Sequence, residues 1–239
     1  MDRAQYDAFT QRLRASLEAD GRVLGLVAMG SMSGEPPEAD AYSDHDFFVA
    51  VRTGEQERMR TDLSWLPDAG EIVLAFRETA HGVKVVYRSG HLAEFAVFDP
   101  DELQLARVNR YRTLLDRAGI DERMRALRER TAREQRPPDR TWLWGQFLTA
   151  LLVGTGRFRR GERLSGRTLL LAAARYLAQL SGMPSDSLDP VRRFPDPRGL
   201  VDGALEQPVP RGALSLLRIA SGLDGFPVEA ARAIEPHLG

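Results

Sequence analysis

Four residues of the N-terminal half have the types and the spacing of a metal and phosphate site. Gly30 and Ser31 follow a short apolar run, and Asp44 and Asp46 enter a second apolar run, Phe47–Val51. Alternate residues of a strand project from the same face, so the two aspartates are expected to point the same way. Paired carboxylates form a hard oxygen site, which is the kind of site that Mg²⁺ prefers.

A third carboxylate, Glu94, lies inside the otherwise apolar run Leu92–Phe98. An ionised carboxylate in such a run is costly unless it is paired, bound to a metal or facing solvent. Three acidic groups gathered by a sheet repel one another, so the pattern predicts a divalent cation or the protonation of one member. Glu94 can serve as a metal ligand or as the general base that takes a proton from a hydroxyl, and we favour the base.

The Gly30-Ser31 pair predicts a phosphate-binding turn directly after a buried strand. Glycine lets the backbone approach a phosphate closely, and the serine hydroxyl and nearby amides can donate hydrogen bonds to its oxygens. A phosphate cradle beside a metal site suits displacement at a nucleotide phosphorus, in which the protein mainly positions the reacting groups.

Arginine supplies almost every cation of the chain, because Lys84 is the only lysine among 33 basic residues. The densest basic cluster follows one apolar segment and consists of Arg157, Arg159, Arg160, Arg163 and Arg167. We predict that Arg159 and Arg160 bind the triphosphate, for which the guanidinium fork is well suited; the alternative is a solvated helix face. The pair Arg192-Arg193 has the same two interpretations, triphosphate binding or a solvated face.

Composition excludes several other classes of protein. The 239 residues include no cysteine, which removes thiolate nucleophiles, disulfide frameworks and zinc–cysteine sites. The net charge of −1 disfavours nucleic acid as a partner. The longest apolar stretch, Phe147–Gly154, is too short to span a bilayer, and the charged N-terminus resembles no signal peptide. A cytoplasmic protein, monomeric or homodimeric and without a membrane partner, is the expectation.

Hydrophobic periodicity predicts an α+β fold with a mixed sheet of at least five strands and flanking helices. Tyr6–Ala19 has the spacing of an amphipathic helix, and Ser89-Gly90 has the spacing of a tight hairpin turn. The expected strands are Val23–Met29, Phe47–Val51, 71–79, 83–88 and 91–98, with a helix over Gly54–Leu63 and a charged helical region over Asp101–Gln135.

The stretch Arg136–Asp139 breaks the pattern and predicts a boundary between two domains, 1–136 and 137–239. We expect the first to be catalytic and the second to be a helical substrate-binding bundle. Its helices are expected over Thr141–Val153, Leu164–Leu180, Asp196–Leu205, Arg211–Leu223 and Val228–Leu238, with GTGRFRRGE as the connection between the first two.

With Met29-Gly30-Ser31, Asp44-His45-Asp46 and a distant strand carboxylate in this order, the chain resembles the nucleotidyltransferase superfamily with the DNA polymerase beta-like fold. The segments GSMSGEPPEADAYSDHDFFVAV, HGVKVVYRSGHLAEFAVFD and FLTALLVGTGRFRRGERLSGRTLLL resemble the lincosamide nucleotidyltransferases more narrowly. His45 departs from the pattern, because a hydrophobic residue is common between the two aspartates, and its imidazole is expected on the opposite face.

This resemblance implies a Mg²⁺-dependent antibiotic O-adenylyltransferase. Asp44 and Asp46 would bind Mg²⁺, expected as two ions, with Glu94 as third carboxylate and base and the triphosphate of ATP or another nucleotide near Ser31. The acceptor would be a hydroxyl of a small antibiotic, a lincosamide first and an aminoglycoside next. The alternatives are an antitoxin-type enzyme that transfers AMP to a protein and a non-catalytic nucleotide-binding module.

Overall fold

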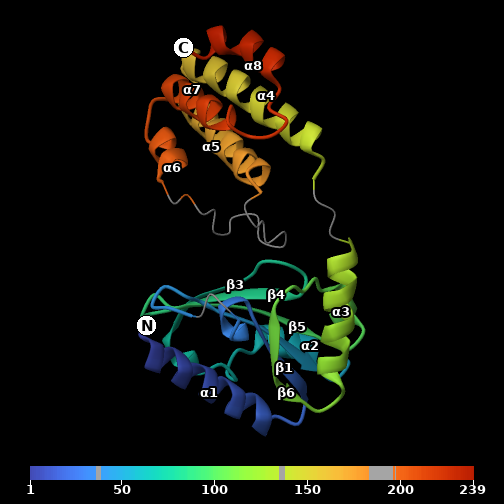
Figure 1. Ribbon diagram of the computed structural model, residues 1–239. Coiled ribbons are helices and arrows are strands. Elements are labelled where there is room, and N and C mark those ends of the chain that lie inside the picture. Colours follow the sequence, from blue (N-terminus) through green and yellow to red (C-terminus); the bar gives the residue numbers. More distant parts are fainter. Residues whose placement is uncertain (36–38, 135–137, 183–195, 197) are drawn as a thin grey trace. The chain divides into compact units, whose positions relative to one another are not determined.

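The chain divides into two compact units, Met1–Gln135 and Arg136–Gly239 (Figure 1). The computed structural model describes residues 1–35, 39–134, 138–182, 196 and 198–239. The first unit combines helices with a mixed six-stranded sheet and the second is helical, so the predicted α+β fold class is confirmed. Arg136 and Pro137 of the expected boundary, and the pair Arg192-Arg193, lie outside the described residues.

The sheet of the first unit has the strand order β3-β4-β5-β2-β1-β6. Strands β2 and β5 pair in parallel, whereas the other neighbours pair antiparallel. Gly90 makes the turn between β4 and β5 at a φ of 81°, which favours glycine. The strands are β1 (Val23–Met29), β2 (His45–Val51), β3 (Ile72–Arg77), β4 (Gly82–Tyr87), β5 (Leu92–Phe98) and β6 (Tyr111–Asp116).

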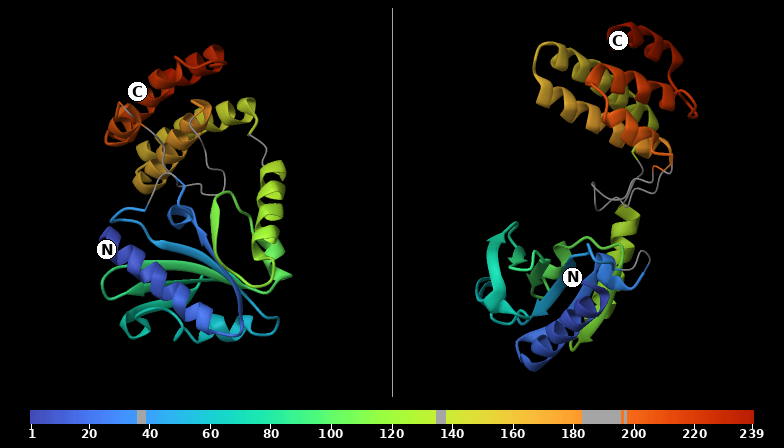
Figure 2. Two further views of the ribbon diagram at one scale, coloured as in Figure 1. Left: turned by 60° about the horizontal axis from the view of Figure 1, so that its bottom comes forward. Right: turned by 90° about the vertical axis from the view of Figure 1, so that its left-hand side faces the viewer.

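Helices cover both faces of this sheet. Helix α1 (Arg3–Ala19) runs across the strands (Figure 2, left) and begins at a capping box formed by Asp2 and Gln5. Its apolar stripe is fully buried in a core shared with alternate residues of β2 and β5 and with Met59 of α2 (Gln56–Thr61). Helix α3 (Ile120–Glu134) packs in a separate core with the residues that point to the other face. This second face also carries the acidic residues, beyond the part that α3 covers.

The expected helical region over Asp101–Gln135 is wrong in its first half, because Tyr111–Asp116 forms β6. Among the described strands this one pairs with β1 alone, and it buries little beyond Leu115, so its sequence shows neither an apolar run nor a clear alternation. Its presence makes β1 an interior strand. Gly25 of β1 lets the start of α3 approach closely, since a Cβ at this position would lie 2.7 Å from Ile120 Cγ1.

The second unit has one core, built mainly from its three longest helices. Helix α4 runs on to Arg159, so the expected connection GTGRFRRGE is largely helical and only its last residues form the turn to α5. Trp144 and Phe147 of α4 lie in the core, while Trp142 is half exposed. The helices are α4 (Arg140–Arg159), α5 (Arg163–Leu180), α6 (Leu200–Leu205), α7 (Val209–Ala220) and α8 (Val228–Ile234), and short 3₁₀ turns are η1 (Gly30–Ser33), η2 (Ala69–Glu71), η3 (Glu102–Leu105) and η4 (Glu235–His237).

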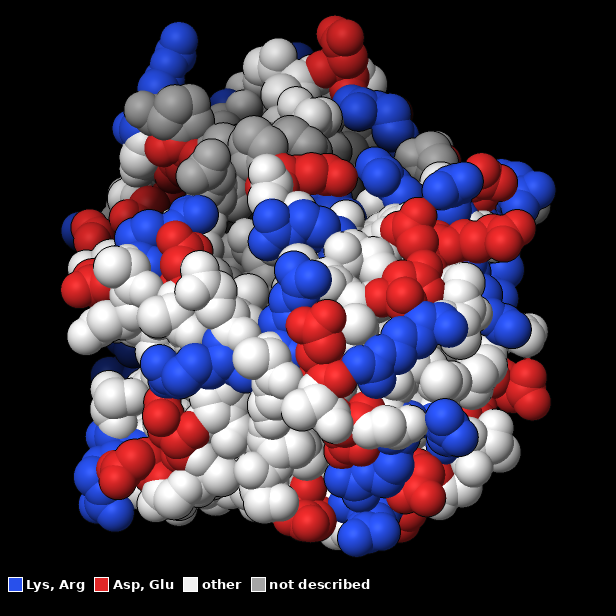
Figure 3. Space-filling view, turned by 90° about the horizontal axis from the view of Figure 1, so that it is seen from below, with Lys and Arg blue, Asp and Glu red and all other residues white. Residues whose placement is uncertain are grey.

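Charged side chains of both signs are interspersed on the face shown in Figure 3. Many charged side chains of the described residues form local ion pairs, such as Arg12 with Asp68 and Arg3 with Asp7. Among the described helices, none has the length and apolar character needed to cross a membrane.

Candidate active site

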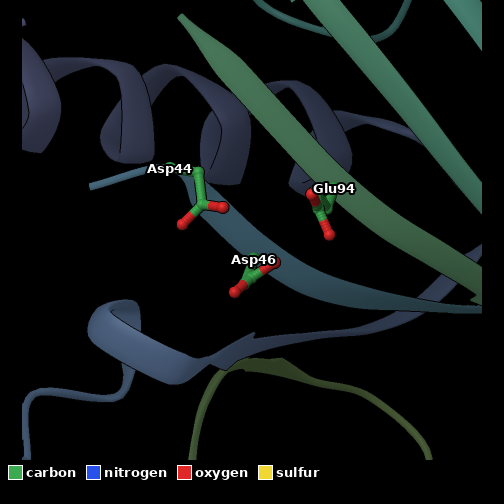
Figure 4. Close-up of side chains that lie close together, drawn as sticks. All are labelled: Asp44, Asp46 and Glu94. Atoms are coloured by element: carbon green, nitrogen blue, oxygen red, sulfur yellow. The ribbon is translucent and has the colours of Figure 1, made fainter. Parts of the chain in front are cut away.

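Strand register brings together the three acidic residues that the sequence singled out. In the parallel pairing of β2 with β5, Asp46 lies directly opposite Glu94. Asp44 stands two residues before Asp46, at the entrance to β2, and its side chain therefore points to the same face. Figure 4 shows the three carboxyl groups gathered on that face of the two strands.

The three carboxylates have the spacing of a cation site. One oxygen from each of Asp44, Asp46 and Glu94 lies within 4.8 Å of the other two, and each residue is partly exposed. Oxygen donors from two or more carboxylates that solvent can reach match the coordination preference of Mg²⁺, which keeps several waters or phosphate oxygens as ligands. The donor set therefore fits the metal that the resemblance implies.

The Gly30-Ser31 turn lies beside these carboxylates as η1, which contacts β2. Gly30 has a φ of 52°, so the chain leaves β1 in a conformation that favours glycine. The Tyr6 hydroxyl of α1 lies 3.3 Å from Ser31 Oγ and donates a hydrogen bond of 3.0 Å to the Asp44 carbonyl oxygen. Burial raises the pKa of Tyr6 to about 12, so this hydroxyl remains protonated and links the turn to the start of β2.

His45 anchors the segment between the two aspartates in the core on the opposite face. Its side chain is fully buried, stacks on Tyr6 at 3.9 Å between ring centroids, and lies 3.0 Å from Thr10 Oγ1. Its Nδ1 lies 2.8 Å from Nε2 of His91. Burial, and then the neighbouring His91, lowers the pKa of His45 to about 3, so the imidazole is neutral.

Lys84 contacts Glu94, and sequence reasoning missed this residue as a member of the site. The Lys84 Nζ lies 3.0 Å from Glu94 Oε1 and 2.9 Å from Glu78 Oε1. Strand register places Lys84 of β4 directly opposite Glu94 of β5. The hairpin predicted around Ser89-Gly90 could have indicated this pairing, because a tight turn sets the register of its two strands.

Two cavities adjoin the acidic cluster. A small one, of about 220 Å³, is bordered by Asp46, Glu94, Glu78 and the apolar residues Met29 and Phe48. A larger one, of about 720 Å³, is bordered by Asp44, Tyr42, Ser43, Arg12 and His91, among others. The larger volume lies in the range of cavities that hold small organic molecules.

The two arginines expected at the triphosphate lie in the second unit. Arg159 Nη1 donates a hydrogen bond of 3.1 Å to the His237 carbonyl oxygen, and Arg160 Nε lies 3.2 Å from Glu162 Oε1. Arg157 pairs with the same Glu162. Much of this basic cluster therefore has partners within its own unit.

No family model matches the chain, and no curated protein sequence matches it. Solved structures similar to it include an aminoglycoside 6-adenyltransferase from Bacillus subtilis, with 11% identity, 95% of this chain and 89% of that chain covered, and a TM-score of 0.30. A nucleotidyltransferase-like protein from Exiguobacterium sibiricum has 13% identity, 98% and 88% coverage, and a TM-score of 0.32. The CD-NTase CdnG from Bradyrhizobium diazoefficiens, in complex with GTP, has 12% identity, 98% and 82% coverage, and a TM-score of 0.29.

Proposed function

We propose that the chain is a Mg²⁺-dependent nucleotidyltransferase that moves a nucleoside monophosphate, AMP from ATP, to a hydroxyl of a small antibiotic. The observation that carries this proposal is the cluster of Asp44, Asp46 and Glu94 beside the Gly30-Ser31 turn. Three carboxylates on one sheet face repel one another, and a bound divalent cation would offset that repulsion.

In the proposed reaction the acceptor hydroxyl oxygen forms a bond to the α-phosphorus, and the bond from that phosphorus to the pyrophosphate oxygen breaks. Glu94 takes the hydroxyl proton, and Ser31 donates a hydrogen bond to a phosphate oxygen. Asp44 and Asp46 hold Mg²⁺, which when bound offsets negative charge on the reacting phosphates. The first unit is then the catalytic domain.

We assign residues 137–239 to acceptor binding, with Arg159 and Arg160 as candidate contacts of the triphosphate. A helical unit of this size is more than the transfer chemistry needs, which favours an enzyme with a dedicated acceptor pocket. A lincosamide is the first acceptor to test and an aminoglycoside the next, following the resemblance of the segments around Asp44, Glu94 and α4.

The test is pyrophosphate release from ATP and Mg²⁺ with a panel of lincosamides and aminoglycosides. We expect turnover with at least one antibiotic, its loss in Asp46→Asn, and its retention in Glu71→Gln, which removes an exposed carboxylate that pairs with Arg88. If no panel member reacts and ATP does not bind, the enzyme proposal is wrong.

Two other outcomes would point to the alternatives. A mass increase of one AMP on a cellular protein, with none on any antibiotic, would favour the antitoxin-type enzyme. Binding of ATP that is unchanged in Asp46→Asn, with no transfer to any acceptor, would favour the non-catalytic module.

A further inference from the structure

Lys84 belongs to the same row of side chains as two of the acidic residues. Register places it opposite Glu94, and Glu94 lies opposite Asp46, so the three project from one face of the adjacent strands β4, β5 and β2. The row therefore carries one positive and two negative charges, with the cation at its outer end.

The contacts of Lys84 fix its charge and its position. The Lys84 Nζ lies 2.9 Å from Glu78 Oε1 and 3.0 Å from Glu94 Oε1, and both carboxylates favour the ammonium form of the side chain. About 23% of the Lys84 side chain and 31% of the Glu94 side chain are exposed, which places the pair at the edge of the cluster rather than in open solvent. Glu78 is more exposed, at 48%.

Stability alone does not explain this arrangement. A partly exposed ion pair adds little to the free energy of unfolding. The ammonium acts on the site through its position, because it lies 3.0 Å from the carboxylate that faces Asp46. It draws Glu94 Oε1 toward β4 and reduces the repulsion between Glu94 and Asp46.

We propose that Lys84 is a positioning residue that holds the Glu94 carboxylate and takes the place of a second divalent cation. Asp44 and Asp46 then bind a single Mg²⁺, and Glu94 is kept for the acceptor hydroxyl instead of serving as a metal ligand. One Mg²⁺ and one ammonium group would offset three of the four negative charges carried by Asp44, Asp46, Glu94 and Glu78. This inference rests on the proposed function, and it replaces the expected pair of metal ions by one.

The test is titration of the full chain with Mn²⁺ alone, with bound and free metal separated by electron paramagnetic resonance. We expect one tightly bound Mn²⁺ per chain. In Lys84→Met the missing charge and the released carboxylate should strengthen binding about fivefold or more, or create a second site. The variant Lys84→Gln should behave in the same way.

Two matched variants separate the role of the charge from that of the ion pair. Lys84→Arg keeps the cation and should restore wild-type stoichiometry with an affinity within about twofold. Glu78→Gln removes the other partner of Lys84 but leaves its contact with Glu94, and should still bind one Mn²⁺. In the Glu94→Gln background, Lys84→Met should strengthen binding less than it does in the wild type, because no ligand is released.

The outcomes distinguish this inference from the proposed function. If the wild type binds no Mn²⁺, or if Asp46→Asn binds it equally well, the metal site and with it the proposed function are wrong. If Asp46→Asn loses the metal but the wild type binds two ions, or Lys84→Met matches the wild type, only the role of Lys84 is overturned. Thermal melting of each variant checks folding, and the wild-type stoichiometry decides the question even if the Lys84 variants do not fold.

Discussion

Acid should destabilise the first unit through His45, and the size of this effect follows from its burial. The pKa of His45 is lowered from 6.5 to about 3 in the folded chain. Between these two pH values the unfolded chain binds a proton at His45 and the folded chain does not. The free energy of unfolding therefore has its full value above pH 6.5 and decreases as the pH falls toward 3. At about 1.4 kcal/mol per pH unit, the loss at pH 5.0 is about 2 kcal/mol.

Native-state hydrogen exchange of peptides from β2 measures this quantity at pH 7.5 and pH 5.0. His45→Gln keeps a polar side chain that can bond Thr10 but has no group that titrates in this range. The variant should be less stable at pH 7.5, by about 1 to 3 kcal/mol, because the imidazole contacts are lost. Between the two pH values, however, it should lose about 2 kcal/mol less than the wild type does.

His237→Gln is the control, because this histidine is exposed in the second unit. It should leave the pH dependence of β2 exchange unchanged. The reasoning is refuted if the wild type and His45→Gln lose the same free energy between pH 7.5 and pH 5.0.

Three glycine-to-alanine substitutions test close contacts and helix propensity in the two units. Urea denaturation measures the free energy of unfolding of each variant. Gly25→Ala should cost about 1 to 3 kcal/mol, because its Cβ would lie 2.7 Å from Ile120 Cγ1; a cost that Ile120→Ala does not reduce would contradict this account. Gly212→Ala should destabilise the second unit by a similar amount, because its Cβ would lie 2.5 Å from the Ala204 carbonyl oxygen; an unchanged midpoint would disprove the close contact between α6 and α7. Gly145→Ala, in the interior of α4 with no atom within 4 Å of the added Cβ, should instead stabilise by about 0.5 to 1 kcal/mol, and a lower midpoint would speak against it.

The sequence predicted the elements whose burial is strongly periodic. The stripe of Tyr6, Phe9, Leu13 and Leu17 is buried along α1, and the apolar runs of β1, β2 and β5 are interior strands. Strand β6 was missed because an edge strand buries few side chains and leaves little pattern to detect. The turn after α4 was placed too early because Gly154 and Gly156 suggest a break, whereas Gly154 lies where α4 packs closely on α5.

Sequence patterns could identify the acidic residues as candidates for the site, but they could not identify the residues that lie opposite them in the sheet. Asp44 and Asp46 belong to one strand, so their common face follows from the period of two. The pairing of Asp46 with Glu94 depends on a parallel register between strands separated by about forty residues, which no local pattern specifies. Tyr6 and Lys84 reach the site from α1 and β4, and neither has a motif that would identify it.

The opposite faces of β2 have complementary roles in this site. Asp44 and Asp46 point toward the cluster, while His45 between them is held from behind by Tyr6, Thr10 and His91. A charged imidazole at this buried position would be costly, and the low pKa keeps it neutral, so the anchor does not add charge beside the carboxylates. Because Tyr6 bonds the Asp44 carbonyl oxygen as well, α1 fixes the backbone of β2 at the point where its two acidic side chains emerge. Positioning of the carboxylates therefore depends on the packing of α1, so substitutions along its buried stripe should weaken metal binding as well as stability.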